Sequence, residues 1–466
     1  MYSARLGAHN MRTGDYHNYK TPEQLTYRKD IGVIDKAGKN IPEYEVVPPP
    51  YVKPFTEILR ANGYYCANNF KCDYQFNAPF TAWDEVSSTV SFRDAPKDKP
   101  FFYVWNTLLT HESRIWERSN KPLTVNPNDV EIPSYFPDIP QVRNDIARKY
   151  SNIEAMDEKV GEIISQLKED GLLENTIIMF WSDHGGNLLR QKRAVGNSGL
   201  NVPLIIRYPN KIDAGKVDDR IVSLMDLGPT VLSLLNIEPP KHYDGKAIAG
   251  KYEESPRKYA FGTADRFDES TDMQRSVLDG RYVYIKNFMP ELPLIYRNKY
   301  RERITMNSKL IKMDSLDMLE GDAKYIFMKT KPFEEFYDLE TDPYEVNNII
   351  DDPKYVGRIN NFRDALQDWQ NEINDQGFIP ENKIVESFWP NLIQPKTESV
   401  EFQMRDDGLY ELTSITNGAS IGYQIEDQIG TNSWSLYHKP ILLGDKQKIV
   451  ARAIRLGYKA SEITSN

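Results

Sequence analysis

The chain has few cysteines and no long apolar run, and each scarcity narrows what the protein can be. Only Cys66 and Cys72 stand among its 466 residues, so a disulfide framework and a cysteine-rich zinc site are excluded, although these two could pair or remain free. The longest apolar runs are strand-sized and interrupted by charge, and the mean hydropathy is −0.60. We therefore expect no membrane span.

Positive charge is also in short supply. The formal net charge is −10 and the isoelectric point is about 5.4. This balance argues against nucleic acid as the main partner, while a local basic pocket could still bind one anionic group. A hydrophobic share of 40% is enough for a large core, and the length predicts two to three domains.

The most informative stretch is the apolar run 176–181, which ends in Ser182-Asp183-His184-Gly185-Gly186. Such a run predicts a strand buried on both faces, and in open α/β sheets the end of such a strand is where ligands bind. Asp183 and His184 could offer oxygen and nitrogen to a divalent cation there. The alternative, equally open from this stretch alone, is an ordinary strand-to-loop turn.

Strands and helices alternate along the first half of the chain. Helical spacing predicts helices over 54–63, 142–170 and 226–235, and apolar runs predict strands over 64–66, 101–105, 176–181 and 202–208. This order predicts an α/β fold with a largely parallel, doubly wound sheet. Beyond residue 395, alternating apolar and polar residues predict a small β-sandwich, with strands over 409–413, 419–425, 434–437 and 448–453.

Several ordered motifs resemble the sulfatases of the alkaline-phosphatase-like superfamily, in particular the heparan N-sulfatase-like branch. The motifs that carry the family resemblance are Ser182-Asp183-His184-Gly185, Arg190-Gln191-Lys192-Arg193, the segment 197–209, the segment 222–230, Tyr243-Asp244-Gly245-Lys246 and the segment 336–343. Those that carry the branch resemblance are Gly63-Tyr64-Tyr65, Lys71-Cys72-Asp73-Tyr74, Thr110-His111-Glu112-Ser113 and the segment 264–269.

The resemblance implies a role for five residues. Lys71 and Lys192 match lysines that grip the sulfate oxygens, and His111 matches a histidine that contacts the sulfate and can protonate the leaving group. Asp183 and His184 match ligands of a calcium ion, although imidazole suits a hard cation less well than oxygen does. Taken one at a time, the lysines could be solvated surface residues and His111 could simply hold a loop.

One part of the family pattern is absent from the sequence. Members of the family attack sulfur with a formylglycine made from a Cys/Ser-x-Pro-Ser-Arg motif, and no such motif occurs in these 466 residues. Cys66 and Cys72 have other neighbours, and Met1 to Gly7 resembles the segment that follows the motif in relatives. We therefore expect a sulfatase that lacks its first strand and is inactive alone, or else a non-catalytic descendant that binds sulfate or a glycan.

The resemblance completes the expected organisation. It implies a sulfatase catalytic domain over 1–255, a C-terminal subdomain with a small antiparallel sheet and a helix near 356–373 over 256–395, and a chitobiase-like accessory sandwich over 396–466. The implied substrate is a sulfate ester or sulfamate, carried by a sugar. A phosphatase or phosphodiesterase of the same superfamily is a weaker alternative, because their zinc cages use several His and Asp ligands and this chain has only 6 histidines, scattered along its length. The family implies a periplasmic or extracellular location, although Met1 to His9 lack a signal-peptide core.

Overall fold

The computed structural model describes residues 38–466 except 40, 43, 73, 268, 269, 299, 445 and 446. Met1 to Gly7 and Asp73, both used in the sequence comparison, therefore lie outside the described residues. Contacts divide the described chain into two compact units: residues 107–377, and residues 38–106 together with 378–466. The domain boundaries 1–255, 256–395 and 396–466 follow the chain in order and remain a proposal.

In the first unit, the predicted strand at the candidate site pairs with the next strand along the chain. β4 (Ile178–Trp181) lies antiparallel to β5 (Leu204–Arg207), with Trp181 opposite Leu204. We predicted a largely parallel sheet; this pair is antiparallel because the connection is a folded loop rather than a helical crossover. β4 is also not buried on both faces, since Trp181 is 37% exposed and β5 is its one strand neighbour among the described residues of this unit.

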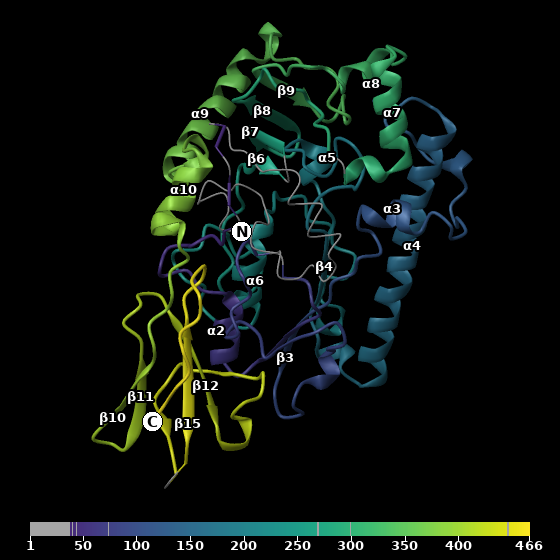
Figure 1. Ribbon diagram of the computed structural model, residues 1–466. Helices are drawn as coiled ribbons and strands as arrows, with labels where there is room; N and C mark the ends of the chain where they lie inside the picture. Colours follow the sequence, from purple (N-terminus) through teal and green to yellow (C-terminus); the bar gives the residue numbers. More distant parts are fainter. Residues whose placement is uncertain are drawn as a thin grey trace. The chain divides into compact units, whose positions relative to one another are not determined.

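A second sheet in the same unit confirms the small antiparallel subdomain. Its order is β6-β7-β8-β9, all antiparallel. Helix α9 (Val356–Glu372) runs along one face and packs Phe362 and Leu366 against Phe336 of the sheet (Figure 1). The four strands are β6 (Ala260–Phe267), β7 (Ser270–Leu278), β8 (Tyr282–Asn287) and β9 (Glu334–Asp338).

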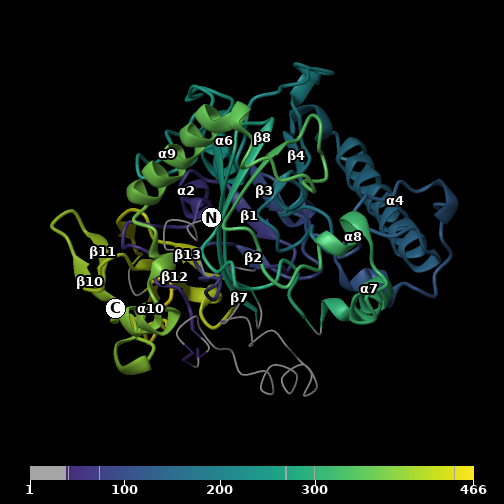
Figure 2. The same ribbon diagram turned by 90° about the horizontal axis from the view of Figure 1, so that it is seen from above.

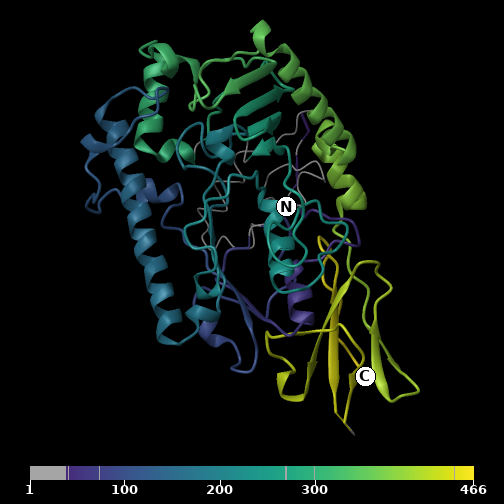
Figure 3. The same ribbon diagram turned by 180° about the vertical axis from the view of Figure 1, so that it is seen from behind.

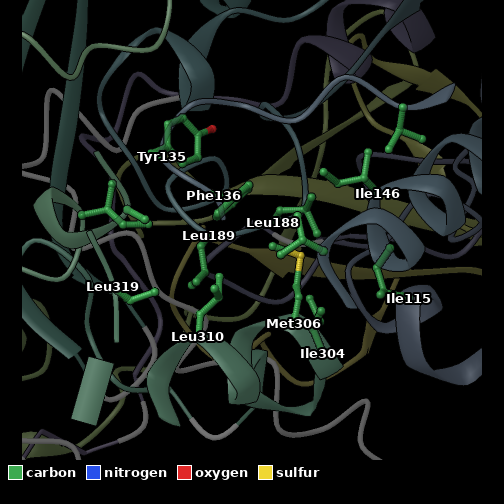
Figure 4. Close-up of a cluster of buried hydrophobic side chains, with 14 of the residues drawn as sticks. Ile115, Tyr135, Phe136, Ile146, Leu188, Leu189, Ile304, Met306, Leu310 and Leu319 are labelled. Atoms are coloured by element: carbon green, nitrogen blue, oxygen red, sulfur yellow. The ribbon is translucent and has the colours of Figure 1, made fainter. Parts of the chain in front are cut away.

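The longest helix of this unit is α4 (Pro140–Glu169), which begins with proline, where the missing N–H costs nothing. It packs beside α7 (Figure 2), and apolar residues from α4, α7 and the loop after β4 form one buried cluster (Figure 4). The remaining helices are α3 (Ser113–Glu117), α5 (Asn197–Leu200), α6 (Leu227–Leu234), α7 (Thr305–Ser315) and α8 (Gly321–Tyr325). None of the helices in the described part of the chain has the length and apolarity to cross a membrane.

The second unit combines residues from the two ends of the described chain. β1 (Tyr65–Asn68) lies between β2 (Glu85–Val86) and β3 (Phe101–Val104), and both pairs are parallel. Helix α2 (Phe55–Ala61) leads into β1, as predicted from its apolar spacing. Helix α10 (Glu381–Phe388) opens the C-terminal portion of this unit.

The predicted sandwich is present in the second unit and appears in yellow in Figure 3. One sheet has the order β10-β11-β14 and the other β13-β12-β15-β16, and their inner faces share a buried apolar cluster. Arg60 of α2 donates to the carbonyl of Trp434 at 2.6 Å, so the sandwich packs on the parallel sheet's helix. The strands are β10 (Glu401–Met404), β11 (Leu409–Thr413), β12 (Ser420–Ile425), β13 (Ser435–Leu436), β14 (Ile441–Leu442), β15 (Ile449–Ile454) and β16 (Thr464–Ser465).

Candidate functional site

The loop after β4 carries the two predicted metal ligands. Nε2 of His184 lies 3.8 Å from Oδ1 of Asp183, whose side chain is 64% exposed. Nδ1 of His184 is 2.7 Å from the carbonyl of Gly185, and a carbonyl can only accept, so Nδ1 carries the proton. In the neutral ring the lone pair is then on Nε2, the nitrogen nearer to Asp183.

Two glycines allow this loop to pack against the following segment. A Cβ on Gly185 would lie 2.0 Å from the carbonyl oxygen of Ser198, and a Cβ on Gly186 would lie 1.9 Å from Oε1 of Gln191. The N–H of Gly185 also donates to the carbonyl of Gly199 at 2.8 Å. The approach of backbone to backbone requires glycine at position 185, whereas the Gln191 and Lys149 side chains near Gly186 could move aside.

The residues just before Lys192 fix the path of its loop. Leu188 and Leu189 are each 1% exposed and insert into the cluster shown in Figure 4. Arg190 donates to the carbonyl of Tyr344 at 2.6 Å, and its φ of 63° lies in the left-handed region. Burying two leucines contributes roughly 3–6 kcal/mol, which exceeds the roughly 1–3 kcal/mol that such a φ costs. The loop therefore has a defined path into Lys192.

The segment 110–113, called the His111 turn below, fixes the tautomer of the His111 imidazole. The backbone N–H of Ser113 donates to Nδ1 of His111 at 3.2 Å, and the Ser113 hydroxyl is 3.1 Å from the same nitrogen. Because a backbone N–H can only donate, Nδ1 is the acceptor and the neutral ring carries its proton on Nε2. That nitrogen is therefore a hydrogen-bond donor, which suits the predicted contact with a sulfate oxygen.

Contacts within the first unit bring the His111 turn to the loop after β4. Asn187 donates from Nδ2 to the carbonyl of Thr110 at 3.0 Å, and Nζ of Lys192 lies 2.9 Å from Oε1 of Glu112. The Asp183 carboxylate is also close enough to influence the Lys192 ammonium electrostatically. Four of the five predicted residues thus belong to one locality.

Lys71 belongs to the second unit, so its place beside the other four residues remains a prediction. It follows β1 in a loop shaped by asparagines. Asn68 donates from Nδ2 to the carbonyl of Lys71 at 3.0 Å and accepts at Oδ1 from Asn106. Both cysteines of this unit are unbridged, and burial raises the pKa of the Cys66 thiol well above its ordinary value, which makes it a poor nucleophile.

The donor set fits part of a divalent-cation site. Asp183 offers carboxylate oxygens and His184 offers the Nε2 lone pair on the same loop. A calcium ion takes about six to eight oxygen ligands, which these two residues cannot supply. Within the described ranges, no group of three or more His, Cys, Asp or Glu side chains is placed to hold a metal ion. The two residues therefore fit as a partial ligand set.

A pocket of about 80 Å³ adjoins Lys192. Its lining includes Lys192 and Arg193 with their chain neighbours, together with residues of the four strands β6 to β9 and of the segment before α7. Polar side chains of this lining are Asp265, Asp272, Gln274, Tyr296, Asn298, Arg301, Glu335 and Glu345. The pocket places hydrogen-bonding groups beside the ammonium, which suits a polar ligand.

Sequence reasoning did not single out two residues that organise this locality. Glu112 and Asn187 join the His111 turn to the loop after β4, across 70 to 80 residues of chain. Glu112 stands directly after His111, and a buried cation such as Lys192 needs an acidic partner. That adjacency is the one signal in the sequence that could have suggested Glu112.

The chain belongs to the sulfatase family, whose members are sulfuric ester hydrolases. A family model described as Sulfatase matches residues 38–237. An ulvan-active sulfatase from Formosa agariphila is 35% identical over 99% of this chain and 80% of the relative. These matches confirm the family that the motifs predicted.

Two further comparisons agree with this assignment. The N-sulphoglucosamine sulphohydrolase of Homo sapiens is 25% identical over 59% of this chain and 57% of the relative. A solved structure from Bacteroides thetaiotaomicron, assigned as a sulfatase, superposes with a TM-score of 0.50 at 18% identity, covering 72% of this chain and 77% of the other. This last likeness confirms the fold class.

Proposed function

We propose that the chain carries the sulfate-binding portion of a sulfatase site that acts on sulfated sugars. The observation that carries the proposal is the joining of the His111 turn to the Lys192 loop through Glu112 and Asn187. A proton donor and a buried cation thereby lie in one locality beside a loop with two metal-type ligands. The names of two relatives, one ulvan-active and one acting on N-sulphoglucosamine, support a saccharide substrate.

Each predicted residue has a distinct task in this proposal. Lys192 binds sulfate oxygens and neutralises the charge that builds up on them in the transition state, the role that the family resemblance implies for Lys71 as well. His111 donates a hydrogen bond from Nε2 to the leaving oxygen or nitrogen of the sugar, which stabilises the negative charge that develops there. Full proton transfer would come from the imidazolium form, which becomes a neutral imidazole when it gives up the proton. Asp183 and His184 would supply two of the ligands of a calcium ion, which when bound would withdraw charge from the sulfate group.

Binding tests the proposal directly. Calorimetry of the chain with glucosamine 6-sulfate, N-sulfoglucosamine and unsulfated glucosamine should show heat only for the sulfated sugars. Lys192→Gln should weaken that binding about tenfold or more, since it removes a charge-assisted contact. Lys159→Gln is the control, because Lys159 is an exposed lysine on α4. Equal binding by Lys192→Gln and the unaltered chain would contradict the proposal.

Turnover separates an enzyme from a glycan-binding descendant. The chain as given contains no Cys/Ser-x-Pro-Ser-Arg motif, so we expect it to release no sulfate. Sulfate release that disappears in Lys192→Ala would overturn this expectation. A chain extended by in-frame upstream codons that encode the motif, produced with the formylglycine-generating enzyme, should hydrolyse the sugar. Binding without hydrolysis in that extended chain would favour the non-catalytic alternative.

The location proposed for the protein is periplasmic or extracellular, as the family resemblance implies. Fractionation of the producing cells with an antibody against the chain tests it. Recovery in the cytoplasmic fraction alone would contradict the proposal.

A further inference from the structure

The carboxylate of Glu112 is almost fully enclosed beside the candidate site. The residue is 1% exposed and stands at the N-cap of α3, directly after His111. Its Oε1 lies 2.9 Å from Nζ of Lys192. Arg193 donates from Nη1 to Oε2 and from Nη2 to Oε1, both at 2.9 Å. One buried carboxylate thus holds two cations that are neighbours in the chain.

An ion pair that only stabilised the fold would need Glu112 and Arg193 but not Lys192. The two-pronged contact between Arg193 and Glu112 already closes the turn, and such a pair has well-defined geometry. Lys192 adds a third partner and uses one of its three ammonium N–H donors for it. Among the described residues, Glu112 is the ion-pair partner of this ammonium, and both Lys192 and Arg193 line the adjoining pocket.

Electrostatics explain what Glu112 does for the lysine. Burial lowers the pKa of the Lys192 ammonium, and the nearby Glu112 carboxylate opposes that effect while Arg193 adds to it. Burial also disfavours the charged form of Glu112, but Arg193 and Lys192 outweigh it and lower the pKa of Glu112 to about 2. The geometry favours the charged form of all three groups, since one carboxylate lies 2.9 Å from both an ammonium and a guanidinium. With all three ionised, these groups together carry a net charge of +1: two cations and one anion.

That charge matches one class of ligand. A sulfate monoester carries a single negative charge, whereas a phosphate monoester carries nearly two near pH 8, because its second pKa is about 6. We propose that Glu112 is a positioning residue that orients Lys192 toward the substrate's sulfate group and keeps the cluster matched to a monoanion. The inference rests on the proposed function, since it takes Lys192 as the residue that binds the sulfate oxygens.

The ratio of two dissociation constants tests the inference. Calorimetry at pH 8 would compare methyl sulfate, a monoanion, with methyl phosphate, a dianion, on the full chain. Glu112→Gln keeps the shape and raises the net charge of the cluster to +2. We expect the ratio to shift toward methyl phosphate by about tenfold or more, since one unit charge is removed a few ångströms from the ligand. A variant that only folds less well scales both affinities by the same factor and leaves the ratio unchanged.

Two further variants serve as controls. Glu112→Asp keeps the charge on a shorter side chain. It should therefore retain the ratio of the two dissociation constants while weakening the binding of both ligands. Glu117→Gln removes a carboxylate of the same helix whose side chain is 40% exposed, and it should leave both constants unchanged. A Glu112→Gln ratio within twofold of that of the unaltered chain would overturn the inference.

The outcomes also distinguish this inference from the proposed function. Failure of the unaltered chain to bind methyl sulfate, or full binding by Lys192→Gln, would contradict the proposed function itself. If Glu112→Gln does not fold, the double variant Glu112→Gln with Arg193→Gln restores the net charge of +1. Its ratio should then equal that of the unaltered chain, with weaker binding of both ligands. A shift toward phosphate in the double variant would contradict the charge-matching argument.

Discussion

At the scale of single residues, the loop after β4 can pack closely because Gly185 has no side chain. Gly185→Ala should destabilise the protein by roughly 1–3 kcal/mol, because its Cβ would lie 2.0 Å from the Ser198 carbonyl oxygen, which belongs to backbone and cannot swing away. It should also weaken binding of a sulfated sugar, since the loop with Asp183 would have to move. Urea unfolding and calorimetry would measure the two effects.

Gly161 provides the matched control for this substitution. It lies on α4, with nothing within 4 Å of the position of its Cβ. Gly161→Ala should therefore stabilise the protein by roughly 0.5–1 kcal/mol, through helix propensity alone. If both alanine variants behaved alike, the close packing described for Gly185 would be wrong.

The sequence predicted individual site residues better than it predicted which residues contact them. Lys192, His111, Asp183 and His184 follow from the order of motifs, and the first unit brings these four to one locality. The pairing of Glu112 with Lys192 joins positions 80 residues apart. Such a contact depends on the tertiary path of the chain, and no periodic pattern in the sequence encodes it.

At the scale of elements, folding buries a carboxylate at the junction of α4 and α7, and this burial disfavours its charged form. Asp145 of α4 accepts the N–H of Met306 at 2.7 Å. Burial nevertheless raises the pKa of Asp145 to about 6, although this contact and the nearby Arg148 act in the opposite direction. The unfolded chain should have a pKa near 3.9 at this position.

This difference predicts a pH-dependent effect of Asp145→Asn. Between about pH 4 and pH 6 the folded state binds more protons than the unfolded state, so this group's contribution to stability falls as the pH rises through that window. An asparagine stays neutral and can still accept the Met306 N–H. Asp145→Asn should therefore be more stable than the unaltered protein by roughly 1–2 kcal/mol at pH 8 and nearly equal to it at pH 4.

Unfolding by urea at the two pH values would measure this difference. Asp157→Asn, at an exposed position of the same helix, is the control and should show no such pH dependence. A constant difference between Asp145→Asn and the unaltered protein at both pH values would contradict the assigned cause.

Elements were predicted well where the local pattern was strong. The periodicity over 142–170 predicted α4, and the alternation beyond 395 predicted the strands of the sandwich. Burial along α4 was predicted less well, since Tyr150 is 40% exposed and Ile153 is 36% exposed. Amphipathic spacing shows which side of a helix is apolar, but it does not show how much of that side a neighbour covers.

At the scale of the whole molecule, the second unit joins residues 38–106 to residues 378–466. Arg60, with 4% of its side chain exposed, donates to the carbonyl of Trp434 at 2.6 Å and to Asp84 at 2.8 Å. Arg60→Met should cost about 3 kcal/mol, because it leaves buried acceptors without their donor. Hydrogen exchange should then speed up together in β1, β3, β12 and β15.

An exposed arginine of the sandwich gives the comparison for this variant. Arg405→Met, at a side chain that is 44% exposed, should leave the exchange of all four strands unchanged. Faster exchange in β12 and β15 alone after Arg60→Met would show that the two segments do not unfold as one unit.

The discontinuity of the second unit also has a consequence during synthesis of the protein. β3 ends at Val104, whereas β12 begins at Ser420, about 300 residues later. At 5–20 residues per second, a ribosome needs roughly 15–60 s to make the intervening chain. Throughout that time the short parallel strands have emerged without the sandwich that packs on α2. A chaperone bound to the nascent chain in that interval would protect their edges from pairing with other chains.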